Sequence, residues 1–492
     1  MLKKTAKRVA VTPESVGIPS GAIAQLIENL DVYRLHTHSL LISRGDTVVA
    51  EAYYAPLKKD FLHRMYSVSK SFVAAAVGLA VTEGLFSLED RVASFFPEFR
   101  SEVNDSYTDR CTVRDMLMMR SNVDGNVYWW GRFESRVRAY YTQPSNKLPG
   151  GHFKYDSIGS FLLGCIIEKV TGKDFLTYMK DRALRAIGFS EDSYVLREPG
   201  GFAVGDSGVV CTARDLWLFA RFLMKGGTWD GVRYIDAAFM QAATARLAPN
   251  AFSGDYALMN TSGYGYLIWK SYDGGFSLIG LGDQLAFCDT VRDVCLVMTA
   301  DNQAERPMRH VVFHEFYRHL LPHVSDAPLS ENREANEHLQ TVLASRKLTA
   351  VQGAAHAPIE SRVFGRRYEK RQGGTDISSF VLTADALHLS CQGREAVLPY
   401  GLSQNRATSF SLGTRSRKGY MGFDVEGVYD GYISAAWTSE NTFSLMAQVV
   451  DEYMGSLNVH IAFIGDEASV HVVGSGQYVF DKTQGSFIAK LS

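Results

Sequence analysis

Residues 65–72 read Met-Tyr-Ser-Val-Ser-Lys-Ser-Phe, and the interpretation of the whole chain starts from this stretch. The pattern predicts a helix from about Val68 that ends at Gly84, because glycine readily takes the left-handed conformation that closes a helix. The helix is apolar nearly all round, which is typical of a buried central helix. Ser67 and Lys70 are three positions apart and therefore share one of its faces.

Ser67 and Lys70 are a candidate catalytic pair. A serine hydroxyl becomes a useful nucleophile only when a nearby group accepts its proton and the developing charge is stabilised. The amine of Lys70 can accept the proton where its surroundings favour the neutral form, and the helix N-terminus helps to stabilise negative charge. Because a charged lysine in an apolar helix costs several kcal/mol unless it is paired, chemistry is favoured over a capping serine beside an exposed lysine.

The first part of the chain mixes helix and strand signals. Helices are expected at residues 20–30, 112–119, 158–170, 212–223 and 307–321, a hairpin at 40–54, and strands at 276–279, 284–288 and 294–299. Strands therefore begin and end this part, with helices between them. This order predicts an antiparallel sheet that is closed by pairing the two ends of the segment.

The last 130 or so residues read almost wholly as short strands with turns. The expected strands include residues 432–438, 442–451, 459–464 and 469–473. A polar helix from Ser330 and an open stretch at 353–358 separate them from the first part. The chain is thus expected to hold a domain at 1–325, a helical linker at 326–357, and a C-terminal all-β barrel or sandwich at 358–492.

Composition narrows the possible partners. Lys and Arg number 51 against 53 Asp and Glu, a net charge of −2, which gives no electrostatic reason to expect nucleic acid or an anionic membrane as the main partner. The N-terminus lacks the apolar stretch of a secretory signal, and the longest apolar helical run, 72–81, is about half of a bilayer span. A soluble, cytoplasmic protein that acts on a small molecule is expected.

The cysteines and histidines give no sign of a metal or a cofactor. The six cysteines are scattered and include no CxxC pair, so a disulfide framework or a structural zinc site is not expected. His310 and His314 are four apart on the closing helix, but Glu315 has the wrong offset for a His-Glu-x-x-His zinc site. His36 and His38 have strand spacing and are expected at the surface or half-buried.

Seven segments in order then suggest a family. They are Thr12-Pro-Glu-Ser-Val-Gly-Ile-Pro, Met65-Tyr-Ser-Val-Ser-Lys-Ser-Phe, Thr112-Val-Arg-Asp-Met-Leu-Met-Met-Arg-Ser-Asn, Tyr155-Asp-Ser-Ile-Gly-Ser-Phe-Leu-Leu-Gly, Thr212-Ala-Arg-Asp-Leu, Lys225-Gly-Gly-Thr-Trp-Asp-Gly and Gly280-Leu-Gly-Asp-Gln. Over roughly the first 320 residues the chain resembles the serine β-lactamase and DD-peptidase superfamily. Within it, the chain is similar to class C β-lactamase-like esterases, amide hydrolases and 6-aminohexanoate-oligomer hydrolases.

The resemblance implies an α+β, β-lactamase/transpeptidase-like fold and a set of site residues. Ser67 matches the acylated nucleophile and Lys70 its proton-accepting neighbour. Tyr155 matches the tyrosine of a Tyr-x-Asn or Tyr-x-Ser element, which shuttles the proton to the leaving group and later activates water, and Ser157 is the third residue of that element. The mechanism implied needs no metal or organic cofactor.

A third element of the superfamily is a strand with Lys, His or another residue, any residue, and then Gly. The best match, Leu278-Ile279-Gly280, makes the backbone N–H groups of Leu281 and Ser67 the oxyanion hole; a shifted register, 280–282, uses Asp283 instead. Neither register contains the Lys or His that helps many relatives to hold a substrate carboxylate. A neutral ester or amide is therefore favoured as the substrate.

Some features leave alternatives open. Trp129 and Trp130 stand where the resembling enzymes build a cleft wall, and they are either substrate-binding residues or buried scaffold. The favoured function is an ester or amide hydrolase with an acyl-enzyme on Ser67. The alternatives are a β-lactamase or DD-peptidase acting on peptide-like substrates, and a non-catalytic penicillin-binding-like sensor. Oligomerisation is possible, and the C-terminal domain is treated as an accessory.

Overall fold

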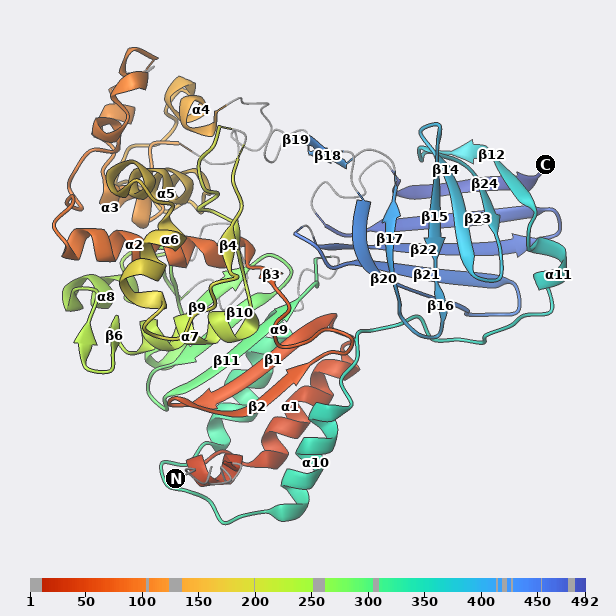
Figure 1. Cartoon of the computed structure of the whole chain (residues 1–492), viewed down its shortest axis with the longest axis horizontal. Coiled ribbons are helices and arrows are strands. Elements are labelled where there is room, and N and C mark those ends of the chain that lie inside the picture. The colour runs from red at the N-terminus through yellow and green to blue at the C-terminus, as the bar shows by residue number, and fades with distance from the viewer. Residues whose placement is uncertain are drawn as a thin grey trace, which may run out of the picture.

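The structure is a computed structural model of the chain. It describes residues 11–102, 106–123, 135–198, 200–250, 262–303, 309–412, 415–417, 423–425, 428–452, 454–476 and 483–492. Two lobes are visible in Figure 1. The N-terminal lobe is the part built around the sheet of β1 to β11, and the C-terminal lobe is the part built around the sheet of β12 to β24.

A six-stranded sheet forms the centre of the N-terminal lobe in the described residues, with the order β2-β1-β11-β10-β9-β8. Its strands are β1 (Thr37–Arg44), β2 (Thr47–Tyr53), β8 (Trp269–Lys270), β9 (Phe276–Gly280), β10 (Gln284–Asp289) and β11 (Val294–Ala300). β1 and β2 form the expected hairpin, and β1 pairs antiparallel with β11, with Leu40 opposite Met298. The predicted pairing of the two ends of the segment is confirmed.

Helices cover both faces of this sheet. On one face α1 (Ser20–Val32) lies beside α10 (Arg333–Ala344) and the π-helix η10 (Glu315–Leu320), which continues α9 (Arg309–His314). On the other face α7 (Ala213–Met224) packs on β1, β10 and β11. The residues of β9, β10 and β11 are all buried as a result. This is the expected α+β architecture of an antiparallel sheet flanked by helices.

The predicted central helix is α2 (Ser69–Thr82), in which every residue from Ser69 to Ala80 is buried. The helix ends at Thr82, two residues before Gly84, whose φ of +72° is the left-handed conformation expected there. Its neighbour α5 (Ile158–Thr171) ends in the same way at Gly172. The remaining elements of this lobe are η1 (Pro13–Val16), β3 (His63–Arg64), η2 (Tyr66–Val68), η3 (Val92–Phe95), η4 (Pro97–Glu102), η5 (Thr108–Arg110), α3 (Val113–Leu117), α4 (Arg136–Thr142), α6 (Phe175–Met179), η7 (Lys180–Leu184), β4 (Tyr194–Val195), β5 (Val209–Cys211), β6 (Thr228–Trp229), β7 (Val232–Arg233), α8 (Ala237–Ala243), η9 (Tyr272–Gly274) and η11 (Leu321–His323).

The C-terminal lobe is a nearly closed barrel formed by one sheet with the order β15-β14-β13-β12-β24-β23-β22-β21-β20-β16, with β17 paired to β20. Its elements are α11 (Glu360–Val363), β12 (Arg367–Gly373), β13 (Ile377–Leu382), β14 (Ala386–Cys391), β15 (Arg394–Pro399), β16 (Gly401–Leu402), β17 (Arg406–Ser411), β20 (Val428–Trp437), β21 (Thr442–Val449), β22 (Gly455–Ile464), β23 (Glu467–Gly474) and β24 (Gly485–Leu491), with a separate hairpin of β18 (Arg415–Arg417) and β19 (Phe423–Val425). In β23 buried and exposed residues alternate, as one core-facing side requires. The predicted all-β C-terminal part is confirmed.

The chain between the lobes contacts both of them. Lys347 forms a parallel bridge with Ala55, and Leu348 packs with Tyr54 of the N-terminal lobe and, at its edge, Tyr432 of the C-terminal lobe. Gln448 on β21 also donates a hydrogen bond to the carbonyl of Thr349 at 2.8 Å. The connection is therefore packed and hydrogen-bonded to both lobes rather than extended through solvent.

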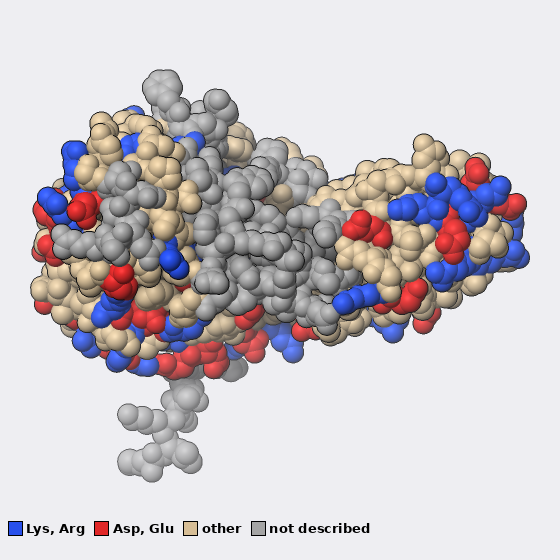
Figure 2. Space-filling view, turned by 90° about the horizontal axis from the view of Figure 1, so that it is seen from above, with Lys and Arg blue, Asp and Glu red and all other residues tan. Residues whose placement is uncertain are grey.

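Charge is spread unevenly over the surface. On the face seen in Figure 2, acidic and basic side chains intermingle on the larger lobe, whereas Lys and Arg predominate at the outer end of the C-terminal lobe. Among the described residues, no helix has the length and apolar character needed to cross a lipid bilayer.

Candidate active site

Ser67 lies in the tight turn η2, directly before α2. The residue before it, Tyr66, has a φ of +45°, a left-handed conformation that is unfavourable for an aromatic residue and costs roughly 1–3 kcal/mol. Such strain persists only where the surroundings hold it in place. It turns the chain sharply, so that Ser67 remains half-buried while its neighbours Tyr66 and Val68 are buried.

Lys70 reaches Ser67 from the first turn of α2. Its side chain is 1% exposed, and its Nζ donates to Ser67 Oγ at 3.0 Å and to the carbonyl of Asp206 at 2.8 Å. The same Nζ lies 5.3 Å from the centre of the Tyr155 ring. The three groups expected to share a site are therefore adjacent, although they come from two separate segments of the chain.

Tyr155 lies just before α5, with its ring near the amine of Lys70. Its ring stacks on Trp269 of β8, with centroids 5.3 Å apart and planes 21° from parallel, so the edge of the sheet fixes its position. The side chain is half-buried, as a residue that meets a substrate has to be. Ser157 is placed differently, because it forms the N-cap position of α5 and is 2% exposed.

Gly280, at the end of β9, lies against the turn that carries Ser67. A Cβ atom at position 280 would come within 2.4 Å of the carbonyl oxygen of Met65, so only glycine allows this approach. The carbonyl of Gly280 points into the turn, where it accepts a hydrogen bond from the N–H of Asp283. The N–H of Leu281 belongs to the same peptide group and, because the peptide is trans, points in the opposite direction, out of the turn. This geometry favours the register 278–280 over 280–282.

Two backbone N–H groups near this turn are candidates for binding a substrate oxygen. In the part of the chain that the structure describes, neither the N–H of Ser67 nor that of Leu281 donates a hydrogen bond outside its own turn. Gln284 donates to the carbonyl of Leu281 at 2.9 Å and holds the turn in place. They are the pair that the sequence analysis predicted as oxyanion-hole donors, and this role stays a prediction.

A buried ion pair lies next to Lys70. Arg136 donates to both carboxylate oxygens of Asp206, at 3.0 and 3.1 Å, with the Arg136 and Asp206 side chains 7% and 0% exposed. Burial alone would raise the pKa of Asp206, but the charges of Arg136 and Lys70 and the Arg136 hydrogen bonds hold it below the usual value. By contrast, burial raises the pKa of Asp156, beside Tyr155. Asp206 therefore keeps its charge next to the amine.

Replacing Arg136 with methionine should destabilise the N-terminal lobe by about 3–5 kcal/mol, because it leaves a fully buried carboxylate without its bidentate partner. Urea unfolding followed by circular dichroism measures the change. Arg185→Met is the matched control, since Arg185 forms its ion pairs at the exposed surface and its loss should leave stability nearly unchanged. Equal effects of the two variants would contradict this role for Arg136.

The structure also shows which residues the sequence missed. Asp206 contacts Lys70, Trp269 stacks on Tyr155, and Arg136 pairs with Asp206, but the sequence analysis named none of the three. A signal for Asp206 was available in its place between glycines at 205 and 208, a pattern typical of a tight functional loop. Trp129 and Trp130, the predicted cleft-wall residues, lie outside the described residues.

Two buried histidines, His38 on β1 and His63 on β3, lie in contact, and His63 comes a few residues before Ser67 in the chain. Nδ1 of His38 is 2.7 Å from Nε2 of His63, and both side chains are 2% exposed. The expectation that His38 is at the surface or half-buried was wrong, because helices cover both faces of the sheet and β1 is buried along both sides. Burial lowers the pKa of both histidines, that of His63 to about 3.

Acid should therefore destabilise the protein through this pair. Above pH 6.5 both histidines are neutral in either state, but below it the unfolded chain takes up protons that the folded chain does not, so stability falls as pH falls towards 3. For His63 the loss between pH 7 and pH 5 is about 2 kcal/mol. The measurement is the difference in unfolding free energy between wild type and His63→Gln at both pH values. A difference that does not change with pH would contradict the prediction.

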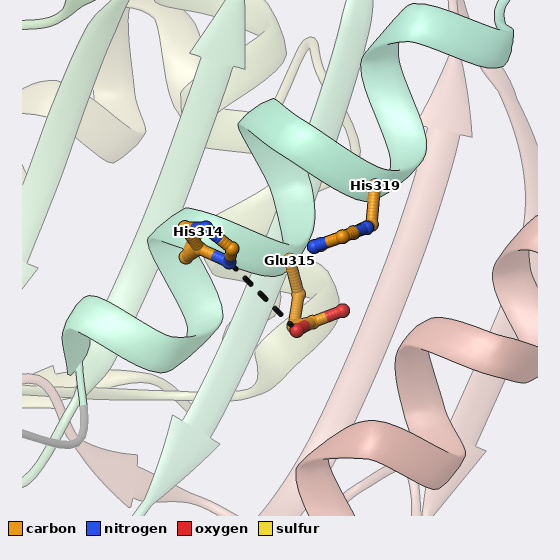
Figure 3. A group of neighbouring side chains, drawn as sticks. All are labelled: His314, Glu315 and His319. Carbon is orange, nitrogen blue, oxygen red and sulfur yellow. Dashed lines mark ion pairs between the residues drawn. The ribbon is translucent and has the colours of Figure 1, made fainter.

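A third group involves the closing helix. Ligand atoms of His314, Glu315 and His319 lie within 4.8 Å of one another (Figure 3). The sequence spacing pointed to His310 and His314, but the wide turn of the π-helix η10 instead brings His319 towards His314. Nδ1 of His314 lies 4.0 Å from one carboxylate oxygen of Glu315, and the other oxygen accepts from the side chain of Asn29 at 2.8 Å. Glu315 therefore already has a hydrogen-bond partner in α1.

Comparison with known proteins places this geometry in context. The family model described as Beta-lactamase matches residues 23–312, more than half of the chain. The 6-aminohexanoate-dimer hydrolase of Paenarthrobacter ureafaciens is 26% identical over 261 residues, which cover 49% of this chain and 65% of that protein. Esterase EstB of Burkholderia gladioli is 26% identical over 170 residues, which cover 30% of this chain and 42% of the esterase.

The chain thus spans less than two thirds of the length of both curated relatives. Among solved structures, a putative 6-aminohexanoate-dimer hydrolase from Bacillus anthracis superposes with a TM-score of 0.50 and 19% identity, covering 59% of this chain and 79% of that one. At this identity the likeness shows the fold.

Proposed function

Because the chain belongs to the beta-lactamase family, we propose that it is a serine hydrolase that cleaves an ester or amide bond through an acyl-enzyme on Ser67. The observation that carries the proposal is the 3.0 Å contact between Lys70 Nζ and Ser67 Oγ at the start of a buried helix. A buried amine that contacts a half-exposed hydroxyl is the arrangement that nucleophilic catalysis by serine requires.

In the proposed reaction Ser67 Oγ attacks the carbonyl carbon of the substrate while Lys70 accepts its proton. The N–H groups of Ser67 and Leu281 stabilise the oxyanion that forms. Tyr155, beside Lys70, passes the proton to the departing alcohol or amine as the C–O or C–N bond breaks. The same groups then activate a water molecule, which hydrolyses the acyl-enzyme and releases the acid and free Ser67.

The proposed substrate class rests on the residues at the end of β9. The strand that ends at Gly280 has Leu278 and Ile279 where many relatives hold a substrate carboxylate with Lys or His. A neutral ester or amide therefore fits better than a carboxylate-bearing substrate. The names of the two curated relatives, an esterase and an amide-oligomer hydrolase, support this class. The mechanism uses side chains and backbone groups of this chain alone.

The test combines labelling with a substrate panel. The protein is incubated with a fluorophosphonate and digested for mass spectrometry, and hydrolysis of p-nitrophenyl butyrate, 6-aminohexanoate dimer and nitrocefin is measured in parallel. We expect one adduct on Ser67 and turnover of the ester or the amide. An adduct elsewhere, or no turnover of either, would refute the proposal, and faster hydrolysis of nitrocefin than of both would identify a β-lactamase instead.

A further inference from the structure

The C-terminal lobe reaches the segment that carries Ser67. The ends of β20, β21 and β22 are directed towards the N-terminal lobe (Figure 1), and the turn between β21 and β22 contacts that lobe. In this turn the N–H of Met454, a residue 1% exposed, donates to the hydroxyl oxygen of Tyr66 at 3.2 Å. Tyr66 is the residue next to Ser67 and the one with the left-handed backbone.

Three more hydrogen bonds hold residues of the same turn against the N-terminal lobe. Arg64 Nη1 donates to the carbonyl of Glu452 at 3.3 Å, and Gln303 Nε2 donates to the carbonyl of Met454 at 2.9 Å. Tyr194 donates its hydroxyl proton to the Glu452 carboxylate at 2.8 Å. These partners come from three separate segments of the N-terminal lobe. Glu452 and Met454 are therefore held in place relative to Ser67.

Arg64 ties this contact to the rest of the site. Its guanidinium lies 4.7 Å from the centre of the Tyr66 ring, and its Nε donates to the carbonyl of Ser207 at 2.9 Å. Ser207 follows Asp206, whose carbonyl accepts from Lys70. The side chain of Tyr66 thus lies between the C-terminal turn on one side and the loop that positions Lys70 on the other.

We propose that Tyr66 is a positioning residue for Ser67 and that Glu452 and Met454, between β21 and β22, hold it in place, so that the C-terminal lobe fixes the nucleophile. The proposal rests on the proposed function. A strained backbone relaxes when its side chain is released, and the relaxation of Tyr66 would rotate the adjoining peptide that carries the N–H and Cα of Ser67. Small displacements of a nucleophile have large effects on rate. The C-terminal lobe is then required for full activity because it positions Ser67, not because it contacts the substrate.

The test is Tyr66→Phe, which removes only the hydroxyl that accepts from Met454. We expect kcat for the ester to fall about tenfold, the equivalent of one lost hydrogen bond, with KM within twofold of wild type. The rate of fluorophosphonate labelling at Ser67 should fall by the same factor. A purely structural role would change thermal stability but not the labelling rate of the folded protein.

Tyr400→Phe is the matched control, because it removes one tyrosine hydroxyl of the C-terminal lobe that donates within that lobe, to the carbonyl of Thr383 at 2.7 Å, and it should leave kcat unchanged. Gln303→Leu, a second variant, releases the carbonyl of Met454 and should lower kcat in the same direction as Tyr66→Phe. If neither Tyr66→Phe nor Gln303→Leu lowers kcat by more than twofold while wild-type Ser67 is labelled, this inference is overturned and the proposed function stands. If wild-type Ser67 is not labelled, the proposed function itself fails.

Discussion

Replacing Ser67 with alanine is expected to lower kcat/KM for ester or amide hydrolysis by at least about 10⁴-fold while leaving the fold intact. The variant lacks the oxygen that forms the acyl-enzyme, so only binding and the two backbone N–H donors remain to accelerate the reaction. Ser67 is half-buried, and the hydrogen bond that its hydroxyl forms in the described residues is with Lys70, so the loss of the hydroxyl should change stability little. Steady-state kinetics, fluorophosphonate labelling and thermal unfolding measure the three effects.

Ser71→Ala is the control for this experiment. Ser71 is a serine on α2, four residues after Ser67; its side chain is buried, and its hydroxyl donates to the carbonyl of Leu267 at 2.9 Å. Its replacement should cost about 1 kcal/mol of stability, the value of one buried hydrogen bond, and leave turnover within a few-fold of wild type. Hydrolysis by Ser67→Ala at a rate close to that of Ser71→Ala would remove the basis of the mechanism.

The parts of the site that could be predicted from sequence are those that local spacing encodes. Ser67 and Lys70 are one helical turn apart, so a correct helix assignment already places them together. Gly280 was predicted from the resemblance to the third element of the superfamily, and its close approach to Met65 gives the physical reason for a glycine there. The match of residues 23–312 to the Beta-lactamase family confirms the resemblance drawn from the ordered segments.

The parts of the site that could not be predicted depend on contacts between distant parts of the chain. Arg136, Asp206 and Lys70 form one network although no local pattern connects them. The grouping of His314 with His319 depends on a π-helical register, which the hydrophobic pattern of a helix does not reveal. The contact between Tyr66 and Met454 joins residues 388 positions apart, and it depends on how two separately predicted lobes dock. The roles of Ser67, Lys70, Tyr155 and Leu281 stay predictions that the variants test.

Replacing Lys70 with methionine is expected to lower kcat by about 10³-fold, in the range that general-base catalysis contributes. Methionine nearly fills the space of the lysine stem but cannot accept the proton of Ser67. The labelling rate of Ser67 should fall with kcat, because attack on the phosphonate needs the same activated oxygen. The variant also leaves the carbonyl of Asp206 without its donor at 2.8 Å, which should cost about 1–3 kcal/mol of stability.

Lys180→Met separates the chemical effect of the Lys70 variant from this structural cost. Lys180 is a buried lysine too, 7% exposed, and its Nζ donates to the carbonyls of Glu191 at 2.9 Å and Ser193 at 2.6 Å. Its replacement removes the same kind of hydrogen bond, so the two variants should lose similar stability, but Lys180 makes no contact with Ser67 and its variant should keep its kcat. If Lys70→Met retained a kcat within tenfold of Lys180→Met, the amine would be a structural donor to Asp206 and the base would have to be sought in Tyr155.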